Sequence, residues 1–390
     1  MSIADCRLPN EEARIPLALY VHFPWCVRKC PYCDFNSHAL RGEVPERDYV
    51  DALLRDLDFE LRDAEARPLA SIFCGGGTPS LFSAAGIGRL LEGVQRRLAF
   101  APEIEITLEA NPGTADAASF RGYRAAGVNR LSIGVQSFDA SMLKALGRIH
   151  GPDEARRAVQ LARDAGFDNV NLDLMYALPR QTVAAAQADL QAAFALAPEH
   201  LSYYHLTLEP NTEFHARPPA LPDADAAWVM QEQGQALLAQ HGYAQYEVSA
   251  YARAGRRCRH NLNYWEFGDY IGIGAGAHGK RTRDGAIRRR ARQKHPRGYL
   301  EAAGTTAVLQ EDRQVPAAEL PFEYAMNALR LNEGFRAHEF EQRTGLPYTA
   351  LAQPLARALG QGLIEQQDST VRPSERGRAF LNPLVELFLP

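Results

Sequence analysis

Short apolar segments alternate with longer amphipathic segments along the first two thirds of the chain. In the first amphipathic segment, Tyr49, Leu53, Leu57 and Leu61 repeat every four residues with charged residues between them, which is typical of a helix with one buried face. The apolar segments have the length and composition of buried strands. The expected strands are Leu17–Phe23, Ala70–Cys74, Glu103–Ala110, Arg130–Gln136, Asn169–Leu174 and His200–Leu208. This alternation predicts parallel βαβ units, arranged as part of a TIM-like barrel.

The pattern changes after residue 318, where helices are followed by a short strand pair and a final helix. Such an order predicts a winged-helix-like module. The helices expected in the barrel are Ala84–Arg97, Ala115–Ala126, Pro152–Ala165, Thr182–Leu196 and Ala224–Gln240, and the later elements are helices near Ala325–Leu331, Glu339–Gly345, Tyr348–Leu359 and Phe380–Phe388 and a strand pair ending at Val371–Pro373. We therefore expect an α/β protein with a partial (β/α)6 barrel over residues 1–245, a barrel-closing segment over residues 246–318 and a smaller α+β winged-helix-like domain over residues 319–390.

Composition is that of an ordinary globular protein, with 46% hydrophobic and 23% charged residues. The formal net charge of -4 disfavours a general nucleic-acid binder. The early apolar run Ile15–Trp25 contains two prolines and a histidine and is too short to span a bilayer, and no secretory signal is visible. Three of the six cysteines are clustered, while Cys6, Cys74 and Cys258 are scattered, unlike a disulfide framework. We expect a cytoplasmic protein.

The cysteine cluster directly follows the first expected strand. Cys26, Cys30 and Cys33 stand in a Cys-x3-Cys-x2-Cys pattern on one loop. Three thiolates hold three corners of a soft metal centre, so the pattern implies either a distant fourth ligand or an open corner. A Cys3His zinc site with His22 or His38 as the fourth ligand, or a set of buried free thiols, are the alternatives.

The spacing of these cysteines, with an aromatic residue just before the last of them, resembles the radical S-adenosylmethionine (SAM) superfamily. The resemblance implies a [4Fe–4S] cluster held by Cys26, Cys30 and Cys33. It also implies that SAM chelates the fourth iron and that Tyr32 lies on the adenine side of SAM. A partial βα barrel is the fold that this resemblance implies, in agreement with the alternating pattern.

Glycine or polar residues follow the ends of successive expected strands, where the chemistry of βα barrels is found. Any one such residue could merely cap the next helix, but a ring of them suits a zwitterionic cofactor. Their types and order are similar to the SAM contacts of the branch related to oxygen-independent coproporphyrinogen III dehydrogenase. This resemblance implies SAM contacts at Tyr20, Gly76, Gly77, Thr78, Glu109, Gln136, Arg148 and Asp173.

A second motif lies beyond the expected barrel. His260, Tyr264 and Trp265 form a His-Asn-x-x-Tyr-Trp string that resembles the haem-binding motif of HemW-type haem chaperones. The resemblance implies His260 as a ligand of haem iron and the two aromatic residues as porphyrin contacts. A hydrogen-bonded loop histidine is the alternative. His278, in the expected glycine-rich loop Gly272–Gly279, is a second candidate ligand.

Basic residues gather on both sides of this motif. Arg256, Arg257 and Arg259 could pair with the propionate carboxylates of haem. The run Lys280–Lys294 is expected to be a solvated face. The alternative for this run is a docking surface for an acidic partner or peripheral contact with an anionic membrane.

Two features separate the chain from the dehydrogenase pattern. Phe35 stands where the dehydrogenase has a fourth cysteine, and only 25 residues precede Cys26. Both favour a haem chaperone that binds the cluster, SAM and haem and transfers haem to an acceptor protein, with a flavodoxin or ferredoxin as electron donor and no specific nucleic acid as partner. The alternative is a radical SAM enzyme that decarboxylates coproporphyrinogen, and a weaker one is a radical SAM enzyme acting on RNA. Whether SAM is cleaved stays open.

Overall fold

The structure, a computed structural model, describes residues 15–62 and 67–390. Its centre is a 12-stranded sheet in the order β14-β13-β12-β11-β1-β4-β5-β6-β7-β8-β10-β9. Six parallel neighbours are the strands expected from the sequence, with ends that differ by at most three residues. They are β1 (Leu17–Phe23), β4 (Leu69–Gly76), β5 (Phe100–Ala110), β6 (Arg130–Gln136), β7 (Val170–Tyr176) and β8 (His200–His205). The expected α/β barrel class is confirmed; Cys6 and the first residues of the expected 1–245 domain lie outside the described residues.

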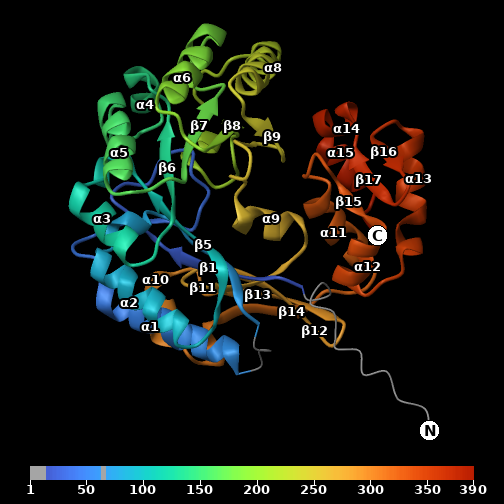
Figure 1. The fold of residues 1–390 in the computed structure, drawn as a ribbon, viewed down its shortest axis with the longest axis horizontal. Helices are drawn as coiled ribbons and strands as arrows, with labels where there is room; N and C mark the ends of the chain where they lie inside the picture. The colour runs from blue at the N-terminus through green and yellow to red at the C-terminus, as the bar shows by residue number, and fades with distance from the viewer. Residues whose placement is uncertain (1–14, 63–66) are drawn as a thin grey trace.

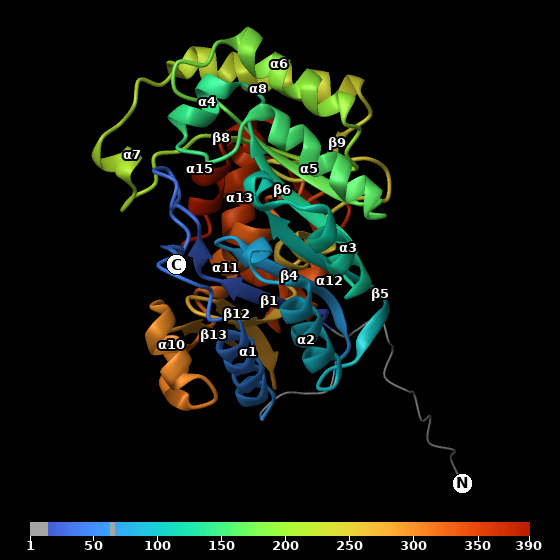
Figure 2. The same cartoon turned by 90° about the vertical axis from the view of Figure 1, so that its left-hand side faces the viewer.

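Helices cover the outer face of the curved sheet (Figures 1 and 2). In α1, Tyr49, Leu53 and Leu57 are fully buried, as their four-residue spacing predicts. Short helices α4 (Ala140–Ala145) and α7 (Glu213–Ala216) lie outside the expected segments. The longer helices are α1 (Glu46–Leu61), α2 (Ala84–Gln95), α3 (Ala117–Ala125), α5 (Pro152–Asp164), α6 (Val183–Ala195) and α8 (Ala224–Gln240), and 3-10 turns are η2 (Pro79–Leu81) and η3 (Pro112–Thr114).

Both edges of the six-stranded core are extended by residues from the expected barrel-closing segment. On the β8 side lie the antiparallel strands β10 (Ala250–Ala252) and β9 (Ala244–Gln245). On the β1 side lie a seventh parallel strand, β11 (Asp269–Ile273), and the antiparallel β12 (His278–Arg283), β13 (Ala286–Arg292) and β14 (Leu309–Gln314). Among the described residues the end strands β9 and β14 do not pair with each other, so the sheet stays open. The division of the chain at residues 245 and 318 stays a proposal.

The expected glycine-rich loop Gly272–Gly279 is partly a strand, which corrects the sequence prediction. Gly272 lies within β11, where a Cβ atom would come 1.9 Å from the carbonyl oxygen of His278. Gly274 has a φ of +104°, and its Cβ would come 2.3 Å from the carbonyl oxygen of His22. The glycines therefore permit close backbone approach between β11, β12 and the end of β1.

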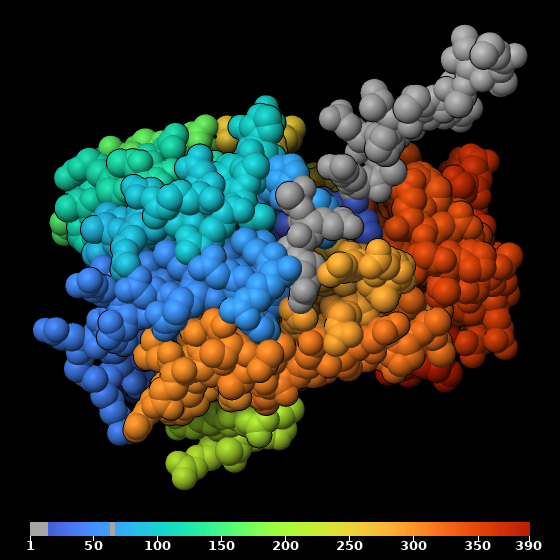
Figure 3. Space-filling model, turned by 90° about the horizontal axis from the view of Figure 1, so that it is seen from below, coloured from blue at the N-terminus to red at the C-terminus, as the bar shows by residue number. Residues whose placement is uncertain are grey.

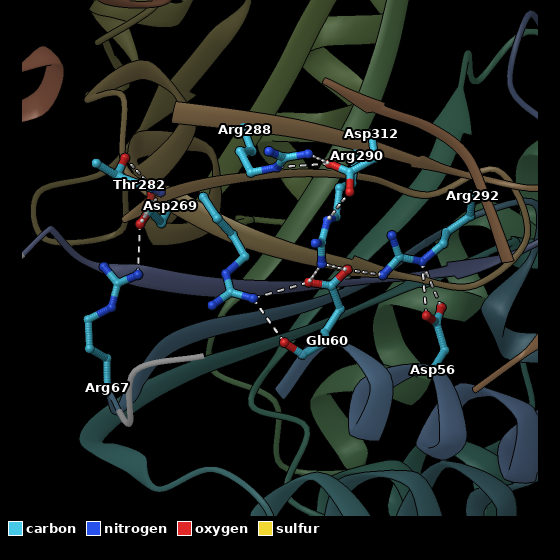
Figure 4. Close-up of polar contacts among 10 residues, drawn as sticks. Asp56, Glu60, Arg67, Asp269, Thr282, Arg288, Arg290, Arg292 and Asp312 are labelled. Carbon is cyan, nitrogen blue, oxygen red and sulfur yellow. Dashed lines mark hydrogen bonds and ion pairs between the residues drawn. The ribbon is translucent and has the colours of Figure 1, made fainter. Parts of the chain in front are cut away.

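The basic run Lys280–Lys294 is not a solvated face throughout, because two residues near its ends, Lys280 and Arg292, are buried in ion pairs. Figure 4 shows Arg292 with its carboxylate partners. Arg292 is 1% exposed, and its Nε lies 2.9 Å from an Asp56 oxygen, while its Nη2 binds Glu60. Lys280 is also 1% exposed and lies 3.1 Å from Asp269. These pairs attach β12 and β13 to α1 and β11, so the charges proposed for a membrane or acidic partner are largely used inside the fold.

The C-terminal segment forms a small α+β unit, as expected, around an apolar cluster that also includes Phe267 and Ile287. Its sheet has the order β15-β17-β16, and Phe340 and Tyr324 lie at the centre of the cluster. Figure 3 shows the orange segment that follows α9 between the blue N-terminal part and the red C-terminal unit. The remaining elements are α9 (Arg259–Trp265), α10 (Pro296–Ala302), η4 (Thr306–Val308), α11 (Leu320–Ala328), β15 (Phe335–Arg336), α12 (Ala337–Thr344), η5 (Tyr348–Leu351), α13 (Ala352–Gly360), β16 (Ile364–Gln367), β17 (Thr370–Pro373), α14 (Glu375–Ala379) and α15 (Leu381–Glu386).

No helix among the described residues is both long enough and apolar enough to cross a bilayer.

Candidate functional site

Two adjoining cavities lie inside the barrel. The smaller, of about 390 Å³, is lined by the cysteine loop and the ends of the parallel strands. The larger, of about 1050 Å³, extends from there toward β11, β12 and the C-terminal unit, where Met326 and Asn327 line it. Residues that line both cavities are Asp34, Phe35, Ser37, Gly76, Glu109, Ser132 and Asp173. Because they share a wall, a ligand in one cavity lies beside a ligand in the other.

The cysteine loop presents all three clustered thiols to the smaller cavity. Two-residue strands β2 (Trp25–Cys26) and β3 (His38–Ala39) pair at its base and hold its two ends together. Cys26, Cys30 and Cys33 are free and half-buried, and burial raises the pKa of Cys26 and Cys33. Among the described residues no three metal-binding side chains converge as a ready ligand set. The donor set of three thiols on one loop in one cavity nevertheless fits a cluster with an open corner.

The structure places neither candidate histidine where it could be the fourth ligand of a zinc site. His22 and His38 line the larger cavity and not the cysteine cavity. The ring of His22 is also fully used, since the Tyr20 hydroxyl lies 2.9 Å from its Nδ1 and the Asn36 carbonyl oxygen 2.8 Å from its Nε2. A Cys3His site in the smaller cavity is therefore not supported by the geometry.

The turn after β11 holds the end of the cysteine loop in place. Asn36, three residues beyond Cys33, donates from its Nδ2 to the carbonyl oxygens of Ala275 at 2.9 Å and Lys294 at 2.8 Å. Gly276 has a φ of +82°, and a Cβ there would come 2.4 Å from the Asn36 Nδ2 atom. The backbone of this stretch thus approaches the barrel mouth, as the sequence indicates, and fixes the loop that carries the cysteines.

Eight of the nine residues expected around SAM line the smaller cavity. They are Tyr32, Gly76, Gly77, Thr78, Glu109, Gln136, Arg148 and Asp173. The ninth residue, Tyr20, lines the larger cavity instead, and its hydroxyl is hydrogen-bonded to His22. Parallel strands bring their carboxyl ends to one edge, which explains why residues so far apart in sequence converge. Gly77 also has a structural role, because its N–H donates to the Phe23 carbonyl at 2.6 Å and a Cβ would come 2.5 Å from the Trp25 carbonyl oxygen.

Arg148 places a fixed positive charge beside the cysteines. Its Nη1 lies 3.6 Å from the Cys30 sulfur and its Nη2 donates to the Gly134 carbonyl oxygen at 2.7 Å.

Gln136, at the end of β6, has a φ of +70°, which few non-glycine residues adopt. The Tyr204 hydroxyl donates to its side chain at 2.8 Å. Strained backbone of this kind often marks a ligand contact.

Two half-buried carboxyl groups, Glu109 and Asp173, stand in the wall shared by the cavities. Burial, together with the charge of Asp173, raises the pKa of Glu109 to about 8, although the Gly76 N–H donates to its carboxylate at 3.0 Å. Burial also raises the pKa of Asp173, which accepts from Asn171 Nδ2 at 2.9 Å and from Ser132 Oγ at 3.4 Å. A site with two such carboxyls favours a cationic ligand.

Asn171 and Ser132 are functional candidates that the sequence interpretation did not select. Both line the larger cavity and both orient Asp173. A usable signal was present, because Asn171 and Asp173 are two residues apart on one strand and so must face the same side. Ser132 and Gly134 are likewise two residues apart on β6, so they face the same side of the sheet.

The side chain of His260 is buried next to the larger cavity and does not line it. Both of its ring nitrogens are within hydrogen-bond distance of hydroxyl groups. Its Nδ1 lies 2.9 Å from the Ser71 hydroxyl and its Nε2 2.9 Å from the Tyr264 hydroxyl. It is 1% exposed, its ring stacks on Phe73, and burial lowers its pKa to about 3. Tyr264 and Trp265 do line the cavity, whereas His260 does not. The two aromatic residues of the motif are therefore accessible to a ligand in the larger cavity, whereas His260 has no free ring nitrogen to bind a metal.

His278 is placed differently. It starts β12, lines the larger cavity and has no ring hydrogen bond to a described residue. Burial, with the nearby charge of Lys294, lowers its pKa, so the imidazole is neutral near pH 7 and keeps a lone pair for a metal.

The arginines beside the motif do not reach the cavity, which corrects the expectation that they pair with propionates. Arg256 lies 3.3 Å from Asp168, Arg257 2.6 Å from Glu333 and Arg259 3.2 Å from Glu103, in each case at the surface. None of the three lines either cavity.

Comparison with known proteins agrees with this geometry. The radical SAM superfamily profile matches residues 20–193, and the HemN C-terminal domain profile matches residues 315–380. The chain is 54% identical over 375 residues to the "Heme chaperone HemW" of Escherichia coli K12, covering 96% of this chain and 98% of that protein. It is 51% identical over 379 residues to the "Heme chaperone HemW" of Haemophilus influenzae, with the same coverage of 96% and 98%.

The fold is shared with a solved radical SAM enzyme. The structure of coproporphyrinogen III oxidase (HemN) from Escherichia coli superposes with a TM-score of 0.82, covering 96% of this chain and 90% of that one at 24% identity. At this identity the likeness concerns the fold alone. The sequence relatives are closer and extend over nearly their whole length, and on that ground the chain belongs to the HemW-type haem chaperone family of the radical SAM superfamily.

Proposed function

We propose that this protein binds a [4Fe–4S] cluster and SAM in the smaller cavity and haem in the larger one, and that it transfers the haem to an acceptor protein. The observation that carries the proposal is the shared wall of the two cavities, with the cysteine loop on one side and a space of about 1050 Å³ on the other. Pockets for drug-sized ligands have volumes of about 300–1,000 Å³, so the larger cavity is big enough for a tetrapyrrole. The names of the two close bacterial relatives support the same proposal.

Each group in the smaller cavity has a role in this proposal. Cys26, Cys30 and Cys33 would hold the cluster, which supplies one-electron chemistry toward the sulfonium of SAM when bound. Glu109 and Asp173 orient the cationic groups of SAM, and Arg148 stabilises negative charge near Cys30. A flavodoxin or ferredoxin would be the matching class of electron donor.

SAM binding is expected to tighten as the pH rises toward and through about 8. A cationic ligand favours the ionised form of Glu109, whose pKa is raised to about 8, so binding below that pH must release a proton. The affinity should change by up to about tenfold per pH unit below the pKa. Calorimetric titration of the reconstituted protein in buffers of different ionisation enthalpy measures both the affinity and the proton released.

The matched variant for this titration is Glu109→Gln, which keeps the shape and removes the charge. It should bind SAM more weakly at high pH and lose the pH dependence. A wild-type affinity that stays constant across the same range would contradict the placement of Glu109 beside a cationic group.

Haem binding to the reconstituted wild-type protein, followed by optical titration, tests the second half of the proposal. We expect one haem per chain and, for His278→Ala, at least about tenfold weaker binding, because His278 is the candidate with an accessible neutral imidazole. His338→Ala, at an exposed position on α12, is the control and should bind as the wild type does. Loss of binding in His260→Ala but not in His278→Ala would assign the iron to His260, which would then have to give up its bond to Tyr264.

The alternative, a coproporphyrinogen dehydrogenase, is favoured by the shared fold. Phe35 counts against it, because this residue is 57% exposed and lines both cavities at the position of the fourth cysteine in the dehydrogenase pattern. Anaerobic incubation with coproporphyrinogen, SAM and a reductant separates the two functions. Stoichiometric decarboxylated product would establish the enzyme and refute a purely chaperone role.

A further inference from the structure

Arg130 is a buried guanidinium that faces the larger cavity without a partner. It is the first residue of β6 and only 2% exposed, yet it belongs to the lining of that cavity. Its Nε atom is buried with no hydrogen-bond partner. Its Nη atoms form no hydrogen bond or ion pair with the described residues. A side chain with five donors in this state is exceptional in a protein interior.

The two carboxylates whose charge acts on Arg130, Glu105 and Asp173, are hydrogen-bonded to other donors. Glu105 accepts the backbone N–H of His260 at 3.1 Å and of Arg259 at 3.2 Å, and its Oε1 lies 3.6 Å from the Cys258 sulfur. Asp173 is held by Asn171 and Ser132. Both carboxylates add favourable charge around Arg130, but neither is hydrogen-bonded to it.

Arg292 provides the contrast within the same protein. It is buried to the same degree, and it contacts two carboxylates, Asp56 and Glu60 (Figure 4). Removing a charge from water is costly unless a partner of opposite charge is supplied. The fold supplies Arg292 with two carboxylates in direct ion pairs, whereas Arg130 has carboxylate charge nearby but no ion pair with it.

We propose that Arg130 binds a carboxylate of the ligand in the larger cavity, which, on the proposed function, is a propionate group of haem. The fork of a guanidinium matches a carboxylate in two parallel hydrogen bonds, which an ammonium group does not. The carboxylate of SAM is not the partner, because Arg130 does not line the smaller cavity, where Arg148 stands.

The test compares haem with haem dimethyl ester, in which both propionates are esterified, on the reconstituted protein. The wild type should bind haem at least about tenfold more tightly than the diester, because a hydrogen bond between charged groups is lost in the ester. Arg130→Gln should reduce haem affinity by a similar factor, leave diester affinity nearly unchanged and so abolish the preference. Arg130→Lys keeps the positive charge but loses the guanidinium fork, so it should retain only part of the preference for haem over the diester. Arg157→Gln, at an exposed position of α5, is the matched control and should keep the wild-type preference.

The outcomes separate this assignment from the proposed function. Equal affinity of the wild type for haem and its diester overturns the assignment without any variant, and so does a full preference in Arg130→Gln; haem binding itself would stand in both cases. Failure of the wild type to bind haem overturns both proposals. A melting temperature of Arg130→Gln at or above that of the wild type is expected, because the variant removes an unpaired buried charge, whereas a large decrease would mark Arg130 as a structural partner of Glu105 and Asp173.

Discussion

Replacing Cys30 by serine is expected to abolish cluster assembly. The three thiols on the loop after β1 line one cavity, and a hydroxyl does not replace a thiolate as a ligand for iron. Cys30 also lies 3.6 Å from the Arg148 guanidinium, so the variant removes the sulfur closest to that charge. After anaerobic reconstitution with iron and sulfide, the variant should lack most of the bound iron, the acid-labile sulfide and the visible absorption band of the wild type.

Cys74→Ala is the matched control for this experiment. Cys74 lies in β4, is fully buried outside both cavities and has a pKa raised to about 12 by burial, so it remains a protonated thiol. This variant should assemble the same amount of iron as the wild type. Full iron content in Cys30→Ser would show that the cysteine loop is not the cluster site.

Replacing Arg292 by alanine is expected to lower the free energy of unfolding by about 3–5 kcal/mol. The variant would leave the carboxyl groups of Asp56 and Glu60 buried without their main cation, and these two side chains are 0% and 2% exposed. Arg290 and Arg281 still contact Glu60, so most of the loss should come from Asp56. Urea unfolding, followed by circular dichroism, measures the difference.

Arg288→Ala serves as the control, because it changes another arginine of the same strand (Figure 4). Its partner is Asp312 at 2.8 Å, but the two side chains are 46% and 26% exposed. An exposed pair of this kind contributes about 1 kcal/mol or less. Equal destabilisation by the two variants would mean that burial does not decide the strength of these ion pairs.

The network around Arg292 also connects stability to the site. Asp56 accepts from the Tyr299 hydroxyl at 2.9 Å, and that hydroxyl lies 3.0 Å from the N–H of Gly274. The turn after Gly274 in turn binds Asn36 of the cysteine loop. We therefore expect Arg292→Ala to reduce cluster retention as well as stability, although none of its atoms reaches the smaller cavity.

Much of the fold and of the candidate site was determined by local sequence. The strands β1 and β6 begin and end at the residues that the apolar pattern predicts, because a buried parallel strand needs a continuous apolar run and the next helix starts with its own cap. The expected site residues came from the resemblance of the cysteine spacing and strand ends to the radical SAM superfamily. They lie together in the structure because the carboxyl ends of parallel strands converge wherever a βα barrel forms.

Only the tertiary structure decided the other features. Glycines 272, 274 and 276 do not have the pattern of a strand, and β11 is recognised only through its pairing with β1, more than 200 residues earlier. Arg292 and Arg130 are the same residue type in the sequence, but one is matched by the carboxylates of α1 and the other faces a cavity. Both ring nitrogens of His260 are likewise hydrogen-bonded, to Ser71 of a distant strand and to Tyr264 of the same helix. The local sequence sets periodicity and turns, whereas the partner of a buried polar group is set by which distant strands meet in the folded chain.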